Sequence, residues 1–168
     1  MKNIFLIGMP SSGKSTIGRQ LARELHYRFT DTDKLIVRQE GRSINDIFAQ
    51  DGEDYFRRVE SEVLHSIRPG SSLVVATGGG APCFHNNMAY MKATGISVFL
   101  DIEPDVLLQR MLVHAIADRP LYPQNDPTLL ENLRKKYADR LPYYAQADIT
   151  VSGETTAGEV LQRLGDWL

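Results

Sequence analysis

The sequence predicts a three-layer α/β/α fold, in which a parallel sheet is covered by helices on both faces. Short apolar runs typical of buried strands alternate along the chain with segments whose apolar residues recur at helical spacing. Strand and helix alternate five times, a pattern that favours parallel strands joined by right-handed crossover helices. The first apolar run, Ile4 to Ile7, also leads directly into a glycine-rich turn and a helical pattern.

The composition is that of an ordinary soluble globular protein. The chain has 168 residues, of which 42% are hydrophobic and 24% charged, so we expect one domain spanning residues 1–168. A net charge of −2 argues against a general binder of nucleic acid or of membrane surfaces. The single cysteine, Cys83, cannot form an internal disulfide, and the first apolar run is too short for a signal or a membrane span. We therefore expect a cytoplasmic protein.

The glycine-rich turn has the spacing of a phosphate-binding loop (P-loop). Gly8, Gly13, Lys14 and Ser15 fit the pattern G-x-x-x-x-G-K-[ST], in which convergent backbone N–H groups hold a polyphosphate. Lys14 would reach the β- and γ-phosphates, and the Ser15 hydroxyl would bind Mg²⁺. The alternative is a chance glycine-rich turn between a strand and a helix. The expected ATP contacts are Ser11, Ser12, Gly13, Lys14, Ser15 and Thr16.

Two carboxylates follow the second predicted strand. Ile17, Leu21 and Leu25 give the first crossover helix one apolar stripe, and the strand-like run Tyr27–Thr30 then ends at Asp31-Thr32-Asp33. Ligands of open α/β sheets bind at the carboxyl ends of the strands, which makes both aspartates candidates for the site. The alternative interpretation is a pair of turn and N-cap residues, and the two roles are compatible.

The next segment reads as helical. Residues 34–50 predict two short helices broken at Gly41, with Ser43 as a cap, and Asp51-Gly52 marks a second break. An amphipathic helix follows over Glu53–Ile67. Its predicted polar side carries Glu53, Arg57, Arg58 and Glu60.

The remaining strands and helices complete the alternation. They are a strand Leu73–Thr77 leading into Gly78-Gly79-Gly80, a helix over about 86–94, a strand Ile96–Leu100, a helix opened by Pro104, a helix Thr128–Ala145 that Pro142 would kink or stop, a strand Ile149–Val151, and a closing helix Ala157–Leu168 with Val160, Leu161, Leu164 and Leu168 inward.

One segment departs from this compact pattern. Residues 113–127 are polar and rich in turn-forming residues, and they contain Pro120, Pro123 and Pro127. The segment exceeds the usual length of a connection, so it predicts a mobile lid over about 112–127. The alternative is a plain surface connection.

A phosphate-binding loop predicts only that a nucleoside triphosphate is bound. The chain lacks the Asn-Lys-x-Asp segment of guanine-nucleotide switches and the bulk of a motor or transporter ATPase. A kinase acting on a small acceptor is the class that remains. Asp31 and Asp33 support it, because phosphoryl transfer needs a carboxylate that orients the metal and a group that positions or deprotonates the attacking hydroxyl.

Several motifs, taken in order, resemble those of shikimate kinase and cover the chain nearly end to end. They are residues 8–20, Asp31-Thr32-Asp33, Gly41-Arg42-Ser43-Ile44 leading to Asp46-Ile47-Phe48, Gly52-Glu53 leading to Phe56-Arg57-Arg58-Val59-Glu60, Gly78-Gly79-Gly80-Ala81 and Asp118-Arg119-Pro120-Leu121. The loop motif is widely shared, whereas the Phe-Arg-Arg segment combined with the triple glycine is much more particular.

The resemblance implies a five-stranded parallel sheet of the nucleoside monophosphate kinase type, in the order 2-3-1-4-5, and transfer of the ATP γ-phosphoryl to the 3-hydroxyl of shikimate. It implies a substrate-binding helical segment at about 33–61. We expect a monomer. The implied roles are catalysis by Lys14, Asp33 and Arg119, with Arg119 brought onto the transferring phosphate by the lid; shikimate binding by Asp33, Arg57, Arg140 and the backbone of Gly78, Gly79 and Gly80; and Mg²⁺ binding by Ser15 and by Asp31 through water.

Alternatives remain for the basic residues. Arg57 and Arg58 each follow an acidic residue at i, i+4, so they are also consistent with a solvated helix face, and Arg140 follows the basic run Arg134-Lys135-Lys136. Cys83 and the four histidines are interpreted as packing or surface residues. Residues 152–155 offer no arginine for the adenine, which leaves Arg110 as the candidate that stacks on the base. Rival functions are another small-molecule kinase, such as gluconate kinase, and an inactive nucleotide-binding module.

Overall fold

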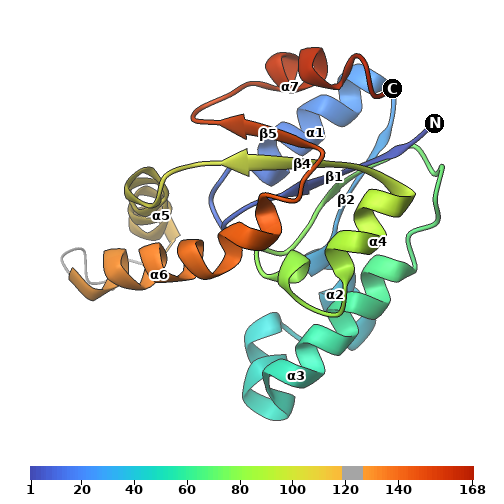
Figure 1. The fold of residues 1–168 in the computed structure, drawn as a ribbon. Helices are drawn as coiled ribbons and strands as arrows, with labels where there is room; N and C mark the ends of the chain where they lie inside the picture. The colour runs from blue at the N-terminus through green and yellow to red at the C-terminus, as the bar shows by residue number, and fades with distance from the viewer. Residues whose placement is uncertain (119–126) are drawn as a thin grey trace.

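The computed structural model describes the backbone of residues 1–118 and 127–168, and the side chains of residues 1–114 and 128–168. Its centre is a parallel sheet of five strands in the order β2-β3-β1-β4-β5 (Figure 1), which confirms the predicted fold class and strand order. The strands are β1 Asn3–Ile7, β2 Arg28–Asp31, β3 Leu73–Ala76, β4 Gly95–Asp101 and β5 Ile149–Ser152.

Strand β1 lies in the middle of the sheet and is buried along its whole length. Ile4 pairs with Val74 of β3 on one side and with Ile96 of β4 on the other. An apolar strand between two parallel neighbours has both faces covered, which explains its continuous rather than alternating hydrophobic run. The loop that follows Ile7 therefore starts at the centre of the sheet edge.

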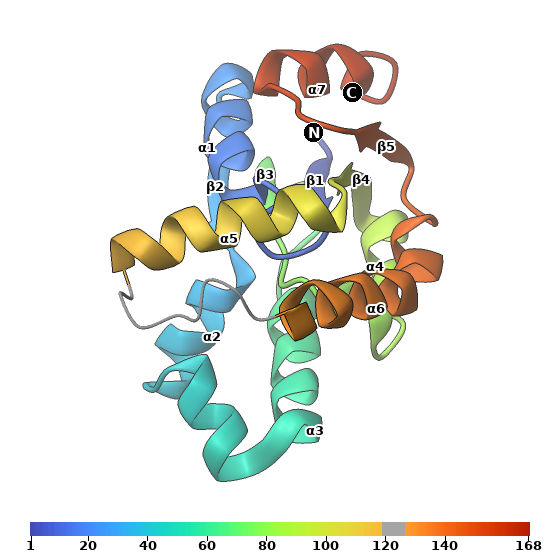
Figure 2. The ribbon, with the colours of Figure 1, turned by 90° about the vertical axis from the view of Figure 1, so that its left-hand side faces the viewer.

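Helices cover both faces of the sheet (Figures 1 and 2). On one face, α1 Lys14–Leu25 and α7 Ala157–Leu164 pack Leu21 and Val160 into a core that includes Leu6 and Val98. The other face is covered around Phe5 and Phe99 by the end of α3 Ile44–His65 and by three further helices. These are α4 Asn87–Thr94, α5 Pro104–Asp118 and α6 Pro127–Tyr144, and the short helix η1 Ala81–Cys83 packs against α4 and α6.

Helices α2 Thr32–Glu40 and α3 Ile44–His65 extend beyond the sheet and share a small core of their own (Figure 2). The predicted breaks are confirmed: Gly41 ends α2 with a φ of 68°, and Gly52 interrupts α3 with a φ of 83°. Ser43 caps α3 by accepting the Asp46 N–H at 3.1 Å. The shared core consists of Ile36, Ile47, Phe56, Val59 and Val63.

Three predicted boundaries differ in the structure. Helix α5 continues about two turns into the predicted lid, because nothing between its opening proline and Asp118 breaks a helix. Helix α6 passes through Pro142 without ending there. Helix α7 ends at Leu164, so the prediction that Leu168 points inward is wrong, and its side chain is 52% exposed. None of the described helices is long and apolar enough to span a membrane.

Candidate active site

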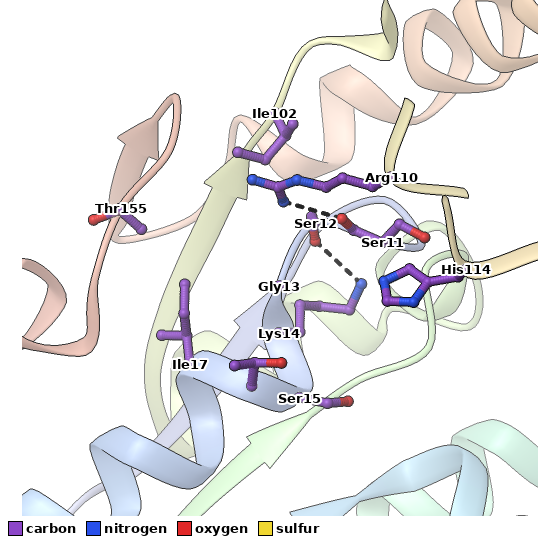
Figure 3. Close-up of a pocket in the computed structure, with 11 residues that line it drawn as sticks. Ser11, Ser12, Gly13, Lys14, Ser15, Ile17, Ile102, Arg110, His114 and Thr155 are labelled. Atoms are coloured by element: carbon purple, nitrogen blue, oxygen red, sulfur yellow. Dashed lines mark hydrogen bonds between the residues drawn. The ribbon is translucent and has the colours of Figure 1, made fainter. Parts of the chain in front are cut away.

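The glycine-rich loop joins β1 to α1 in the strand-loop-helix context that its motif requires. Gly8 and Gly13 take φ values of 148° and 98°, which side chains with a Cβ rarely adopt. At Gly8 a Cβ would also lie 2.8 Å from the carbonyl oxygen of Leu100. The six residues of the loop that were predicted to contact ATP line one cavity of about 470 Å³ (Figure 3): Ser11, Ser12, Gly13, Lys14, Ser15 and Thr16.

Lys14 reaches back across the loop to its backbone. Its Nζ donates to the carbonyl oxygens of Gly8 at 2.7 Å and Met9 at 2.8 Å. Burial lowers the pKa of Lys14 from 10.5 to about 8, Asp33 opposes that shift, and Arg140 adds to it. A polyphosphate in the cavity would favour the protonated ammonium, because an adjacent anion stabilises a buried cation.

Ser15 and Asp31 meet at the mouth of this loop. The Ser15 hydroxyl donates to Oδ2 of Asp31 at 3.3 Å. The other carboxylate oxygen caps α2 by accepting the N–H groups of Asp33 at 2.9 Å and Lys34 at 3.4 Å. Asp31 is therefore an N-cap, as its alternative interpretation proposed, with one oxygen left to face Ser15.

This pair of oxygen donors fits Mg²⁺. That ion prefers oxygen ligands, retains several waters, and usually needs only one or two protein groups beside the substrate phosphates. The described residues hold no cluster of three or more histidine, cysteine or acidic side chains suited to a metal. A metal bound here would consequently depend on the nucleotide for part of its coordination.

Helix α5 contributes Arg110 and His114 to the lining of the cavity (Figure 3). Arg110 Nη1 donates to the Ser11 carbonyl at 3.1 Å, and its Nη2 lies 3.7 Å from Oε1 of Glu154. The sequence interpretation missed four lining residues, Ile17, Ile102, His114 and Thr155. His114 follows Arg110 at i+4, so helical spacing gave a signal for it, whereas the approach of Thr155 depends on the fold.

Arg57 is buried, with only 8% of its surface exposed, so the solvated-face alternative is wrong for this residue. Its guanidinium pairs with Glu60 at 3.0 Å and Glu53 at 3.3 Å, and lies over the Phe84 ring at 4.3 Å. A Cβ on Gly80 would lie 2.6 Å from Arg57 Nη2, so the bare glycine lets the guanidinium pack on the backbone. Arg58, by contrast, is largely solvated, as that alternative proposed.

Arg140 differs in environment from the basic run before it. Arg134, Lys135 and Lys136 are exposed, whereas Arg140 is half-buried. Its Nη1 would lie 2.9 Å from a Cβ on Gly79, and it donates to the Met9 sulfur at 3.9 Å. Arg57 and Arg140 therefore reach the triple glycine from α3 and α6 respectively.

Two carboxylates face the same glycine loop. A Cβ on Gly78 would lie 2.7 Å from Glu60 Oε2 and 3.0 Å from Asp33 Oδ1. Burial raises the pKa of Asp33, and the nearby Asp31 raises it further. Burial also raises the pKa of Glu60, with Arg57 opposing the shift. The sequence interpretation placed Glu60 on the polar side of its helix. Its i, i+3 spacing from Arg57 predicts an ion pair, but its burial depends on tertiary neighbours such as Gly78.

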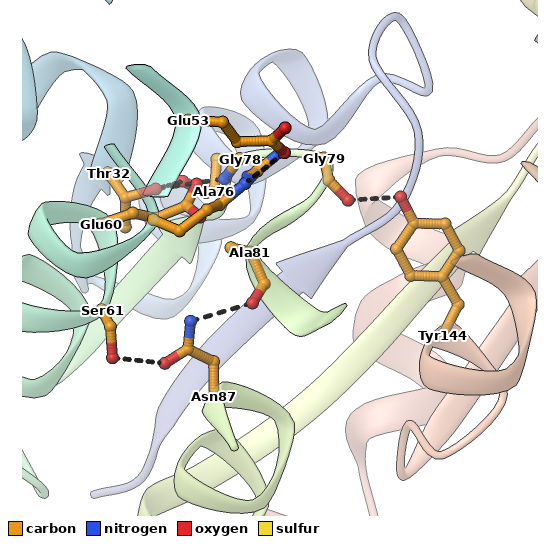
Figure 4. Close-up of polar contacts among 11 residues, drawn as sticks. Thr32, Glu53, Glu60, Ser61, Ala76, Gly78, Gly79, Ala81, Asn87 and Tyr144 are labelled. Carbon is orange, nitrogen blue, oxygen red and sulfur yellow. Dashed lines mark hydrogen bonds and ion pairs between the residues drawn. The ribbon is translucent and has the colours of Figure 1, made fainter. Parts of the chain in front are cut away.

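Side chains from three helices hold the triple-glycine segment in place (Figure 4). Gly78 N–H donates to Thr32 Oγ1 at 3.1 Å, and Asn87 Nδ2 donates to the Ala81 carbonyl at 2.9 Å. The Tyr144 hydroxyl donates to the Gly79 carbonyl at 2.5 Å. Cys83, close by, is half-buried, and burial raises the pKa of its thiol, in agreement with a packing role.

Comparisons with known proteins agree with this arrangement. The sequence profile of the shikimate kinase family matches residues 10–168. A shikimate kinase of Clostridium botulinum is 42% identical over 147 residues, which are 88% of this chain and 85% of that protein. The chain belongs to the shikimate kinase family. It is thus an ATP-dependent kinase, and its family acts in aromatic amino acid biosynthesis.

Solved structures of the family share the whole fold. The shikimate kinase from Acinetobacter baumannii, solved in complex with shikimate, has a TM-score of 0.87 and 34% identity, covering 99% of this chain and 94% of that one. The shikimate kinase from Bacteroides thetaiotaomicron has a TM-score of 0.84 and 33% identity, covering 99% and 97%. Arg119 and the rest of residues 119–126 of the predicted lid lie outside the described residues.

Proposed function

We propose that the chain transfers the γ-phosphoryl of ATP to the 3-hydroxyl of shikimate, giving shikimate 3-phosphate and ADP. The observation that carries the proposal is the convergence of Arg57 and Arg140 on the triple-glycine segment, beside Asp33. A planar guanidinium fork is suited to a carboxylate, so two of them favour an acidic acceptor over a neutral one. Arg140 strengthens the discrimination, because it is half-buried and forms no ion pair among the described residues, so an acceptor without a carboxylate leaves this cation without an anionic partner.

On the donor side, the residues from Ser11 to Thr16 hold the triphosphate with backbone N–H groups and the start of α1. Lys14 leaves its loop carbonyls and binds the β- and γ-phosphates. Ser15, and Asp31 through water, would hold Mg²⁺. When bound, the ion neutralises charge on the phosphate oxygens and orients them for transfer. Arg110 lines the same cavity and would stack on the base.

On the acceptor side, Asp33 is the group that takes the proton. Its raised pKa brings the carboxylate closer to the operating pH than an ordinary aspartate, as a general base requires. The 3-hydroxyl oxygen forms a bond to the γ-phosphorus, the bond from that phosphorus to the ADP oxygen breaks, and the hydroxyl proton passes to Asp33. Arg57 and Arg140 hold the carboxylate, with the N–H groups of Gly78, Gly79 and Gly80 completing the pocket.

The lid, the oligomeric state and the location of the protein are part of the same proposal. Arg119 would approach the transferring phosphate when the lid closes, and closure would exclude water that otherwise hydrolyses ATP. The single domain, the monomeric state and the cytoplasmic location stay predictions. Analytical ultracentrifugation at several protein concentrations tests whether the protein is monomeric.

A coupled ADP-release assay tests the function. Purified protein with Mg-ATP is offered shikimate, gluconate and a nucleoside monophosphate in parallel, and shikimate 3-phosphate is identified by mass spectrometry. We expect ADP release with shikimate alone. Release with gluconate instead would assign the rival kinase activity. Binding of ATP with no turnover of any acceptor would support the inactive nucleotide-binding module.

A further inference from the structure

The carbonyl oxygens of the triple-glycine segment are paired, while two of its N–H groups are left open. Gly78 O accepts the Ala81 N–H at 3.1 Å, and Gly79 O accepts the Tyr144 hydroxyl at 2.5 Å. No acceptor among the described residues takes the N–H of Gly79 or Gly80. In a trans peptide the N–H points opposite to the C=O of the same plane, so fixing each carbonyl also aims the N–H that follows it.

The surroundings of Tyr144 stabilise its hydrogen bond to the Gly79 carbonyl. Its side chain is fully buried on α6, and its ring packs against Phe99 with 4.9 Å between the centroids. Burial raises the pKa of the hydroxyl to about 12, which keeps it a proton donor. Glycine has no Cβ to restrict its backbone, so the orientation of the Gly79–Gly80 peptide depends on such an external partner.

Tyr144 also joins this peptide to the donor side of the site. Its hydroxyl lies 3.7 Å from the Met9 sulfur, which Arg140 Nη1 approaches to 3.9 Å. Arg140 and Tyr144 are one turn apart on α6, and Met9 belongs to the loop whose carbonyl holds Lys14. One face of α6 therefore contacts the acceptor glycines and the phosphate-binding loop together.

We infer that Tyr144 is a positioning residue of the kinase reaction: its hydroxyl fixes the Gly79–Gly80 peptide so that the open N–H groups face the acceptor. The inference rests on the proposed function, since it takes shikimate as the molecule those groups meet. It does not place Tyr144 in contact with either substrate. It predicts a loss that falls on acceptor affinity rather than on nucleotide affinity.

The test compares Tyr144→Phe with Tyr143→Phe, which removes the same hydroxyl from the neighbouring residue, 40% exposed. Loss of one buried hydrogen bond should raise the shikimate KM of Tyr144→Phe about five- to twentyfold. The ATP KM should stay within about twofold and kcat within about threefold. Tyr143→Phe should match the wild type in all three. Equal shikimate KM values for the two variants, or equal losses for both substrates, would overturn the inference.

Amide hydrogen exchange over residues 78–81 separates this inference from the function on which it rests. We expect exchange at Ala81, whose N–H donates to the Gly78 carbonyl, to be faster in ligand-free Tyr144→Phe than in Tyr143→Phe, since the segment has lost its anchor. Unchanged exchange would refute the positioning role whatever acceptor the enzyme uses. A wild type that does not phosphorylate shikimate refutes the proposed function, and exchange still decides the role of Tyr144.

Discussion

Replacing Arg57 by alanine should affect both folding and substrate binding, because the residue is one half of a buried ion pair. Arg57 is 8% exposed and its partner Glu60 is 1% exposed, with 3.0 Å between Nη1 and Oε1. The second carboxylate oxygen of Glu60 is buried without a partner among the described residues. Removing Arg57 therefore leaves a buried carboxylate without its ion-pair partner, a change that costs about 3–5 kcal/mol.

For a chain of this size, that cost lowers the melting temperature by roughly 6–20 °C. Arg58→Ala is the matched control, because its side chain is 63% exposed and pairs only loosely with Glu62 at 4.0 Å. That variant should change the free energy of unfolding by no more than about 0.5 kcal/mol. Chemical denaturation of the two variants measures both values, and an Arg57→Ala loss below about 1 kcal/mol would refute the buried pair.

The double variant Arg57→Ala, Glu60→Gln separates the two roles of the arginine. A glutamine at position 60 carries no charge that could be left uncompensated, so most of the lost stability should return. The shikimate KM should stay high in both variants, because the guanidinium that would hold the carboxylate is still missing. Recovery of the KM together with stability would mean that Arg57 acts on the fold alone.

The sign of the pH dependence follows from Glu60. Its pKa is raised in the folded state, so above the ordinary value of 4.5 the folded protein binds more protons than the unfolded chain. The stability contributed by the protonated carboxyl is then lost as the pH rises. Without Arg57 the upward shift increases, and the deficit of Arg57→Ala should grow as the pH rises from about 5 towards neutrality. A deficit that shrinks over this range would contradict the assignment.

Three further predictions concern the rest of the site. Asp33→Asn should lower kcat about 10²- to 10⁴-fold while ADP titration calorimetry still finds nucleotide binding; near-normal turnover would make Asp33 a helix residue only. The pKa of Lys14 falls from 10.5 to about 8 on folding, so the wild type gains stability as the pH rises from 8 to 10.5. Lys14→Met lacks this gain, and the free energy of unfolding of the variant relative to wild type should drop by up to about 3 kcal/mol over that range. A stability difference between variant and wild type that does not change with pH would refute the burial of Lys14. Arg110→Ala should raise the ATP KM about tenfold, with the shikimate KM unchanged. Arg134→Ala, at an exposed position of α6, is the control. Equal changes of the ATP KM in the two variants would mean that Arg110 does not contact the nucleotide.

Most of the fold was predictable because its signals are local. The Gly41 and Gly52 breaks follow from backbone conformations that favour glycine, and both have positive φ. The apolar stripes of α1 and α3 identify which side faces a core. Boundaries that depend on tertiary packing were less accessible. Pro142 lies within the last turn of α6, where a missing N–H removes only one bond, so the helix continues past it.

The site was predictable where a motif carries its own chemistry, and less so where burial decides the role. Ser11 to Thr16 and Arg110 line one cavity, as expected. The environments of Arg57, Arg140 and Glu60 could not be read from helical spacing, because a charge on a helix looks the same whether water or another segment covers it. Phe84 and the triple glycine, distant in sequence from α3, are what bury Arg57.

Strand register explains why the donor and acceptor groups meet at all. Leu6 of β1 pairs with Ala76 of β3, which pairs in turn with Asp31 of β2. The three strands therefore end at the same level, and the phosphate-binding loop, the triple glycine and the two aspartates leave the sheet side by side. Inserting one residue in β3 would displace the acceptor loop by about 3.3 Å and turn its strand over. The separation of γ-phosphate and hydroxyl is thus set within the sheet, and the helices refine it.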